Sequence, residues 1–300
     1  MLTPAEPRPY VGRFAPTPSG PLHLGSLATA LASWMEARVH RGRWLVRIED
    51  LDPPREEPGA ADQILRTLEA YGLTWDGSVR YQSQHHADYQ AALNQLIQQG
   101  RAYPCRCSRK QLAAAAAYPG FCRHLKKVPK PPYAWRFRVT EAEVRWTDGL
   151  QGVKQVALES LGDPVILRKD GYWAYQLAVV TDDLDQGVTH VVRGIDLMDS
   201  TPWQLDLAHC LANQVSIPFQ YTHLPVIVNS QGQKLSKQNK ATPLCHERPS
   251  EVLYRVLRAL GQTPDPQWIE LHPEALLTLA QQHWSIAPLR GEQTIDLASL

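Results

Sequence analysis

The chain has 300 residues, 43% of them hydrophobic, which is enough for one large core or two smaller ones and excludes a disordered protein. Lys and Arg number 31 against 30 Asp and Glu, so the formal net charge of +1 gives no global basic field for nucleic acid, and any RNA contact requires a local patch. The first residues show no leader pattern and no run reaches about 18 apolar residues, so we expect a soluble cytoplasmic protein without membrane contact.

A turn rich in glycine and proline, residues 15–21, separates a predicted strand from a predicted helix. The strand covers residues 10–14, and the helix starts near Pro21 and ends at Gly42. Such a strand, turn and helix start can present backbone N–H groups and a positive helix end to phosphates, although no familiar phosphate-loop pattern is present. His23 at the helix start can either donate to a polyphosphate or simply cap the helix.

Two further buried strands are predicted to end in charged residues. The strand at 44–48 leads to Glu49, and the strand at 188–192 leads to Arg193. Sites in open α/β sheets gather at the carboxyl ends of strands, so these side chains are candidates for a functional cluster.

The remaining elements alternate between helical and extended patterns. We predict helices over 59–71, 83–99, 201–212, 249–260 and 273–282, and strands over 133–138, 144–146, 165–168 and 223–228. The helix at 83–99 is expected to begin with a Ser cap. Residues 172–176 are expected to re-enter the core, followed by an apolar run to Val180. The alternation predicts an α/β protein.

Cys105, Cys107 and Cys122 lie close together among Ala-rich and Pro-rich segments. The total of five cysteines is odd, which argues against a disulfide framework, whereas three thiolates at this spacing can hold a structural Zn²⁺ with one further ligand. His124 suits zinc chemistry in general, and Tyr118 lies between the cysteines in the chain. Plain buried thiols are the alternative.

Two distant motifs give the chain a family resemblance. Residues 23–26, His-Leu-Gly-Ser, resemble the HIGH motif of class I aminoacyl-tRNA synthetases, and residues 234–238, Lys-Leu-Ser-Lys-Gln, resemble their KMSKS loop. The segments at 13–20 and 47–52 are similar to the glutamyl branch of that class. The resemblance extends from about Tyr10 to Leu260 and departs from both motifs, with Ser26 and Gln238 in place of His and Ser.

The resemblance implies a Rossmann-type α/β catalytic domain in two halves, 8–100 and 171–245. Between them, the insertion at 101–170 would carry the zinc site and a small α+β unit that faces the acceptor nucleic acid. The segment at 246–300 is expected to be helical, and no anticodon-binding domain is expected after the KLSKQ motif.

The reaction implied by the resemblance is attack of a glutamate carboxylate on the α-phosphorus of ATP, which gives glutamyl-adenylate and pyrophosphate. His23 and Lys237 would be the catalytic residues, because charge accumulates on phosphate oxygens. ATP, accompanied by Mg²⁺, would be bound by His23, Gly25, Ser26, Lys234 and Lys237. A solvated basic turn is the alternative reading of the two lysines.

Glutamate carries both charges, so its site needs cations for the carboxylates and an anion for the ammonium group. The resemblance assigns this site to Arg13, Phe14, Ala15, Pro16, Thr17, Glu49, Tyr175 and Arg193. A structural ion pair between Arg13 and Glu49 is the alternative.

Within the glutamyl branch, the chain resembles the glutamyl-queuosine tRNA(Asp) synthetases, which attach glutamate to queuosine in the anticodon loop of tRNA(Asp). Some of these present Cys-x-Cys, Tyr and Cys in the order seen here, which favours Tyr118 over His124 as the zinc ligand. The resemblance thus implies tRNA(Asp) carrying queuosine as a partner, and a monomer. The other hypotheses are a minimal synthetase that charges a tRNA 3′ end, and a non-catalytic module that binds ATP or RNA.

Overall fold

The computed structural model describes residues 9–113, 115, 117–140, 143–212, 219–228, 244 and 247–296. The KLSKQ motif, with Lys234 and Lys237, lies outside these residues. Among the residues described, no helix is long and apolar enough to cross a membrane.

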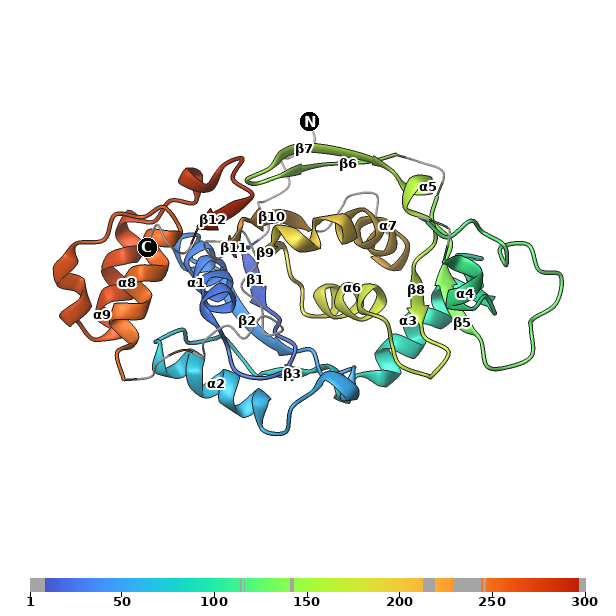
Figure 1. Ribbon diagram of the computed structural model, residues 1–300, viewed down its shortest axis with the longest axis horizontal. Helices are drawn as coiled ribbons and strands as arrows, with labels where there is room; N and C mark the ends of the chain where they lie inside the picture. The colour runs from blue at the N-terminus through green and yellow to red at the C-terminus, as the bar shows by residue number, and fades with distance from the viewer. Residues whose placement is uncertain are drawn as a thin grey trace, which may run out of the picture.

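Parallel strands form the centre of the molecule (Figure 1). Strand β1 (Val11–Phe14) pairs with β2 (Arg43–Ile48), which pairs with β3 (Arg80–Tyr81). On its other side β1 lies beside β9 (His190–Gly194), which pairs with β10 (Gln220–Leu224). The resulting order β3-β2-β1-β9-β10 brings the carboxyl ends of β1, β2 and β9 to one edge.

Helices cover both faces of this sheet. Helix α1 (Leu24–Val39) packs against β1, β2 and β9, whereas α6 (Tyr175–Asp185), α7 (Thr201–Ala212) and α3 (His86–Gln98) pack against one another. Neighbouring residues of β9 point to opposite faces: Val192 joins the core cluster of α1, and Val191 joins the cluster of α6 and α7. Helix α2 (Ala60–Ala70) contributes to the α1 core.

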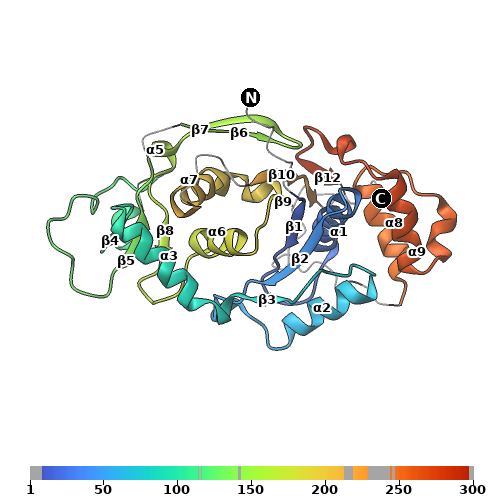
Figure 2. The ribbon, with the colours of Figure 1, turned by 180° about the vertical axis from the view of Figure 1, so that it is seen from behind.

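The segment between α3 and α6 forms an antiparallel insertion. Strands β4 (Ala102–Cys105), β5 (Ala134–Phe137) and β8 (Val165–Leu167) make one sheet, and β6 (Glu143–Asp148) and β7 (Gly152–Ala157) make a hairpin. Short helices α4 (Arg109–Leu112) and α5 (Leu158–Leu161) accompany them. The hairpin arches back to β10, as Figures 1 and 2 show.

The C-terminal segment packs against the first half of the chain. Helices α8 (Pro249–Ala259) and α9 (Pro273–His283) contact α1, and β11 (Val226–Val228) pairs in parallel with β12 (Thr294–Asp296). The α8 and α9 pair and the β4-β5-β8 sheet lie at opposite ends of the molecule (Figure 2). Short 3-10 turns occur at Pro53–Arg55, Gln82–Gln84, Ile195–Ser200, Pro266–Glu270 and Ala287–Leu289.

Two predicted helix starts were wrong. Helix α1 begins at Leu24, not near Pro21, because the backbone of His23 is still extended at the N-cap position. Helix α3 begins at His86, and Ser83 does not cap it. The backbone N and Oγ of Ser83 instead donate to the Asp50 carboxylate at 2.8 and 2.6 Å, within a 3-10 turn.

Several strand predictions were incomplete. The sequence patterns missed β3, β4, β7 and β12, and the predicted strand at 223–228 is in fact two strands, β10 and β11. The run ending at Val180 is part of helix α6, which continues to Asp185. Except for β7, which forms a hairpin with β6, these short strands pair with partners remote in sequence, and local periodicity does not report such pairing.

Candidate active site

A cavity of about 480 Å³ opens at the carboxyl ends of β1, β2 and β9, beside the start of α1. The structure brings together around it every residue that the sequence analysis assigned to the glutamate site, and the described part of the predicted ATP site. These residues are Arg13, Phe14, Ala15, Pro16, Thr17, His23, Gly25, Ser26, Glu49, Tyr175 and Arg193. The two lysines of the KLSKQ motif are not among the residues described.

The wall formed by β1 and β2 contains arginines paired with a buried carboxylate. Asp183 Oδ1 accepts from Arg13 Nε at 3.2 Å and from Arg47 Nη1 at 2.7 Å. Burial opposes the charge of Asp183, but the two arginines outweigh it and lower the pKa of this carboxyl. The hypothesis of an Arg13–Glu49 ion pair is wrong, since Arg13 pairs with Asp183 and the carboxylate of Glu49 lies 3.6 Å from Arg47.

Glu49 lies directly after β2 at the edge of the cavity. Its backbone N donates to the carbonyl of Pro16 at 3.0 Å, which ties the strand end to the turn after β1. Burial raises the pKa of Glu49 to about 6, against the lowering effect of Arg47 and Arg13. At neutral pH Glu49 is therefore ionised although burial disfavours its charge, and an ammonium group beside it would stabilise that charge.

The wall formed by β9 holds Arg193 with neutral partners. Its guanidinium donates through Nε to His223 at 3.1 Å, through Nη1 to Tyr175 and Gln204 at 3.2 and 2.7 Å, and through Nη2 to Thr201 and the Leu197 carbonyl at 2.9 and 3.2 Å. Within the described ranges no carboxylate forms an ion pair with Arg193, although the side chain is buried. A buried cation in neutral surroundings strongly attracts an anion.

The start of α1 forms the phosphate-binding side of the cavity. His23 is the N-cap, and its Nδ1 accepts from the backbone N of Ser26 at 3.3 Å. In the neutral imidazole the proton is therefore on Nε2, which makes that nitrogen a donor. The first turn of α1 contains no acidic residue, so the positive end of the helix keeps its attraction for phosphate.

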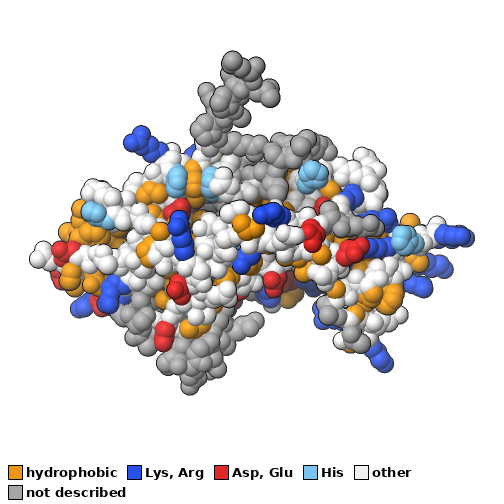
Figure 3. All heavy atoms as spheres, turned by 90° about the horizontal axis from the view of Figure 1, so that it is seen from above, with side chains coloured by type: hydrophobic (Ala, Val, Ile, Leu, Met, Phe, Trp, Pro, Cys, Tyr) orange, Lys and Arg blue, Asp and Glu red, His pale blue; other side chains and the backbone are white. Residues whose placement is uncertain are grey.

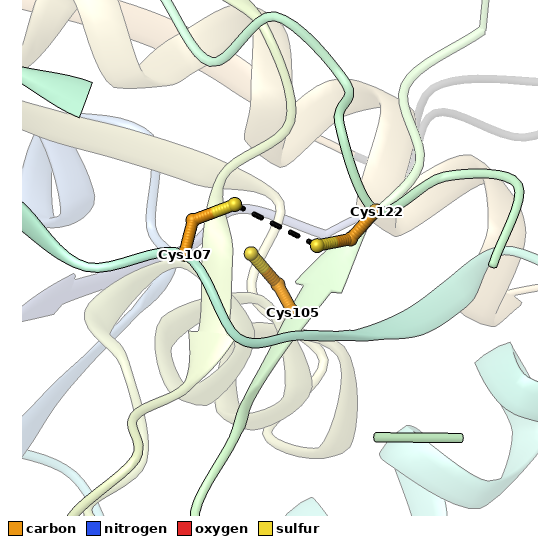
Figure 4. Close-up of side chains that lie close together, drawn as sticks. All are labelled: Cys105, Cys107 and Cys122. Carbon is orange, nitrogen blue, oxygen red and sulfur yellow. Dashed lines mark hydrogen bonds between the residues drawn. The ribbon is translucent and has the colours of Figure 1, made fainter. Parts of the chain in front are cut away.

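Sulfur atoms from two segments of the insertion converge at a second place (Figure 4). The Sγ atoms of Cys105, Cys107 and Cys122 all lie within 4.8 Å of one another. The Tyr118 hydroxyl lies 3.4 Å from Cys105 Sγ and 3.8 Å from Cys107 Sγ. His124 is exposed and does not belong to this cluster. Three thiols and a phenol oxygen at these separations fit the tetrahedral coordination of Zn²⁺.

The same insertion carries a basic surface that the sequence analysis did not single out. Residues 89–140 contain no Asp or Glu, and this lack of acidic residues could have indicated a basic surface from the sequence. The exposed cations there, called the basic surface below, are Arg106, Arg109, Lys110, Lys126, Lys127 and Lys130. Figure 3 shows Lys and Arg side chains gathered at this end of the molecule. A chain with a net charge of +1 thus has the local patch that an RNA contact requires.

Comparison with known proteins decides the family. Residues 10–267 match the model of the family described as tRNA synthetases class I (E and Q), catalytic domain. The chain belongs to this family. The predicted class I synthetase catalytic domain of mixed α/β fold is thereby confirmed, and the protein is a ligase of the aminoacyl-tRNA synthetase type.

Relatives in this synthetase family include the glutamyl-Q tRNA(Asp) synthetase of Pseudomonas putida (strain W619). It is 50% identical over 293 residues, covering 97% of this chain and 98% of the relative. The protein of that name from Neisseria meningitidis serogroup C (strain 053442) is 50% identical over 288 residues, covering 92% of this chain and 96% of the relative.

A solved structure shares the synthetase fold. The crystal structure of a glutamate tRNA ligase from Elizabethkingia meningosepticum CCUG26117 in complex with its amino acid matches with a TM-score of 0.79 at 23% identity. The match covers 97% of this chain and 68% of that chain, and it supports the fold alone.

Proposed function

We propose that the protein activates L-glutamate with ATP and transfers the glutamyl group to queuosine in the anticodon loop of tRNA(Asp). The observation that carries this proposal is the cavity, where Arg13 and the Tyr175 hydroxyl can bind carboxylate oxygens, the charge of Arg193, unpaired among the described residues, attracts them, and Glu49 can bind an ammonium group. The names of the relatives at 50% identity support the acceptor.

In the activation step a carboxylate oxygen of glutamate forms a bond to the α-phosphorus of ATP, and the bond to pyrophosphate breaks. The arginines and Glu49 hold the amino acid, so that one carboxylate faces the start of α1, where ATP binds. His23 donates from Nε2 to a phosphate oxygen, and the α1 N-terminus and Lys237 stabilise the developing charge. Mg²⁺ bound with ATP would add charge neutralisation.

In the transfer step a hydroxyl oxygen of queuosine forms a bond to the glutamyl carbonyl carbon and gives up its proton. The bond from that carbon to the adenylate phosphate breaks, and AMP leaves. The basic surface supports an RNA partner, because lysines and arginines attract phosphates whatever the sequence of the RNA. The proposal assigns the activity to a cytoplasmic monomer. It retains the division into catalytic halves at 8–100 and 171–245, an insertion at 101–170 and a C-terminal segment at 246–300.

The proposal includes a structural Zn²⁺ held by Cys105, Cys107, Tyr118 and Cys122. When bound, the ion would link the segment after β4 to the loop that precedes β5, and four protein ligands would leave no position for catalysis. We expect Cys122→Ser to lose bound zinc in elemental analysis, and His124→Ala to retain it. Zinc retained by Cys122→Ser and lost by His124→Ala would overturn this ligand set.

The deciding experiment measures transfer of labelled glutamate, with ATP, to two preparations of tRNA that differ only in queuosine. Labelling of the queuosine-containing tRNA alone is the expected result. Equal labelling of both would instead indicate a synthetase that charges the 3′ end. Absence of labelling, together with absence of glutamate-dependent exchange of pyrophosphate into ATP, would reject the enzyme.

A further inference from the structure

A buried pair of side chains connects the insertion hairpin to the cavity. We infer that Asp148 and His223 are positioning residues, which hold the guanidinium of Arg193 in the orientation that a substrate carboxylate requires. The inference deepens the proposed function and rests on it, because Arg193 belongs to the proposed glutamate site. Asp148 and His223 themselves do not line the cavity.

The hydrogen bonds of His223 dictate its tautomer. Arg193 Nε can only donate, so His223 Nε2, 3.1 Å away, must accept. The ring proton is then on Nδ1, which lies 2.5 Å from the carboxylate Oδ2 of Asp148. The imidazole is neutral, and each of its nitrogens has one defined role.

Asp148 is itself firmly held in the hairpin turn. Its Oδ1 accepts from the backbone N of Leu150 at 3.1 Å, of Gln151 at 3.0 Å and of His223 at 3.2 Å. The turn also fits closely against β10, because a Cβ on Gly149 would lie 2.4 Å from Thr222 Oγ1. The carboxylate therefore has one orientation, and it transmits that orientation to the imidazole.

The surroundings of His223 favour the neutral ring. The Tyr221 ring on the same strand stacks at a centroid distance of 5.9 Å, and Thr201 Oγ1 on α7 lies 3.2 Å from Nε2. The charged groups that act on His223 are Asp148 from β6, Arg193 from β9 and Asp196 after β9. Burial lowers the pKa of His223, with Arg193 acting in the same direction and the aspartates opposing it.

A change of the His223 tautomer would replace its hydrogen bond to Arg193 with repulsion between two donors. With a proton on Nε2, the imidazole would present a donor to the Nε–H of Arg193, and the guanidinium would have to turn away. Asp148→Asn can cause this change, because an amide that donates to Nδ1 moves the ring proton to Nε2. The expected effect is weaker binding of glutamate, with ATP binding unchanged.

The test is titration of glutamate into purified full-length variants by calorimetry. We expect Asp148→Asn to raise the Kd for glutamate about tenfold, because that is the usual effect of losing one hydrogen bond to a charged group. His223→Asn, which can keep the bond to Asp148 but not the acceptor for Arg193, should act similarly. His223→Gln places an acceptor near the position of Nε2 and should restore most of the affinity.

Asp163→Asn is the matched control, since Asp163 is an equally buried carboxylate of the insertion that pairs with Arg123, outside the cavity. It should leave the Kd for glutamate unchanged, even if the free energy of unfolding falls. Folded Asp148→Asn and His223→Asn variants that bind glutamate within about twofold of wild type would overturn the inference. Wild-type protein that binds no glutamate would instead reject the proposed function.

Nitrogen NMR of the histidine rings keeps the inference testable if the variants do not fold. In the wild-type protein at neutral pH, His223 should show a protonated Nδ1 and an unprotonated Nε2. A cationic ring, or a proton on Nε2, would overturn the inference.

Discussion

Two walls of one cavity use the same residue type in opposite ways. On the β1 and β2 wall, Arg13 shares the buried carboxylate of Asp183 with Arg47, so its charge is partly balanced within the protein. On the β9 wall, Arg193 has only neutral acceptors among the residues described. The difference indicates that the first wall is stabilised by its own ion pairs, whereas the second keeps positive charge available for an anionic substrate.

The first wall is part of a larger buried network. Arg47 is fully buried, and Asp182 next to Asp183 accepts from Arg80 at 2.8 Å and from Gln82 at 2.6 Å. The Tyr89 hydroxyl also donates to Asp182, at 3.0 Å. These side chains come from β2, the β3 region, α3 and α6, so the network joins both halves of the fold.

Removal of a shared carboxylate should break the first wall and give the largest loss of stability. In Asp183→Asn, two buried guanidinium groups lose their common partner, and the free energy of unfolding should fall by about 3–5 kcal/mol. Urea denaturation followed by circular dichroism measures this. Asp170→Asn is the control, because Asp170 pairs with Arg168 at the surface, where solvent screens the pair, so its loss of stability should be much smaller than that of Asp183→Asn. Equal losses in the two variants would refute the contrast.

Replacement of the cation on the second wall should affect catalysis more than stability. Arg193→Lys keeps the charge but loses the planar fork, so we expect kcat/KM for glutamate to fall by about 10-fold to 100-fold. The free energy of unfolding should fall by less than in Asp183→Asn, since the partners left behind are neutral. Steady-state kinetics and denaturation of the same preparation check both. A larger stability loss than in Asp183→Asn would count against the comparison.

Glu49 lies between the two walls and should give the site its pH dependence. With a pKa of about 6, Glu49 becomes protonated as the pH falls below that value, and kcat/KM for glutamate should then fall about tenfold per pH unit. A profile of kcat/KM between pH 5 and 8 measures this.

Glu49→Gln should lose activity at every pH and gain stability at neutral pH. Folding raises the pKa of Glu49 from 4.5 to about 6. The stability associated with the protonated side chain is therefore fully present below pH 4.5 and is lost as the pH rises through 6. A neutral amide should therefore stabilise the protein by about 1–2 kcal/mol at pH 7.5. Loss of stability in this variant at pH 7.5 would show that the Arg47 interaction dominates.

The smallest effect is expected from charge reversal far from both walls. Lys126→Glu combined with Lys127→Glu should raise KM for tRNA a few-fold and reduce its salt dependence, if the basic surface contacts RNA phosphates as the proposed function requires. Glutamate-dependent pyrophosphate exchange should not change. Arg290→Glu, an exposed cation of the C-terminal segment, is the control and should leave KM for tRNA unaltered. An equal rise in KM for Arg290→Glu would show that the effect depends on the net charge of the protein and not on the basic surface.

Sequence patterns and the family resemblance predicted which residues meet at the cavity. Glu49 and Arg193 were singled out because each lies at or just after the end of a predicted buried strand, and parallel strands end at one edge of a sheet. Arg13 was assigned to the site by the family resemblance. The turn at 15–21 and His23 were found because proline and glycine interrupt periodic segments. Both rules depend on residues that are neighbours in the chain.

The interactions that hold these residues in place could not be predicted, because they arise from the packing of remote elements. Asp183 reaches Arg13 across 170 positions, and Asp148 reaches His223 across 75, between elements whose separate patterns show no relation. Polar residues such as Asp183, which follows the apolar run of helix α6, or His223, in a short strand, have no local feature that identifies a partner. Ion pairs and hydrogen bonds form at distances of about 3 Å, which are set by the packing of whole elements, whereas a sequence pattern reports only which face of its own element a residue occupies.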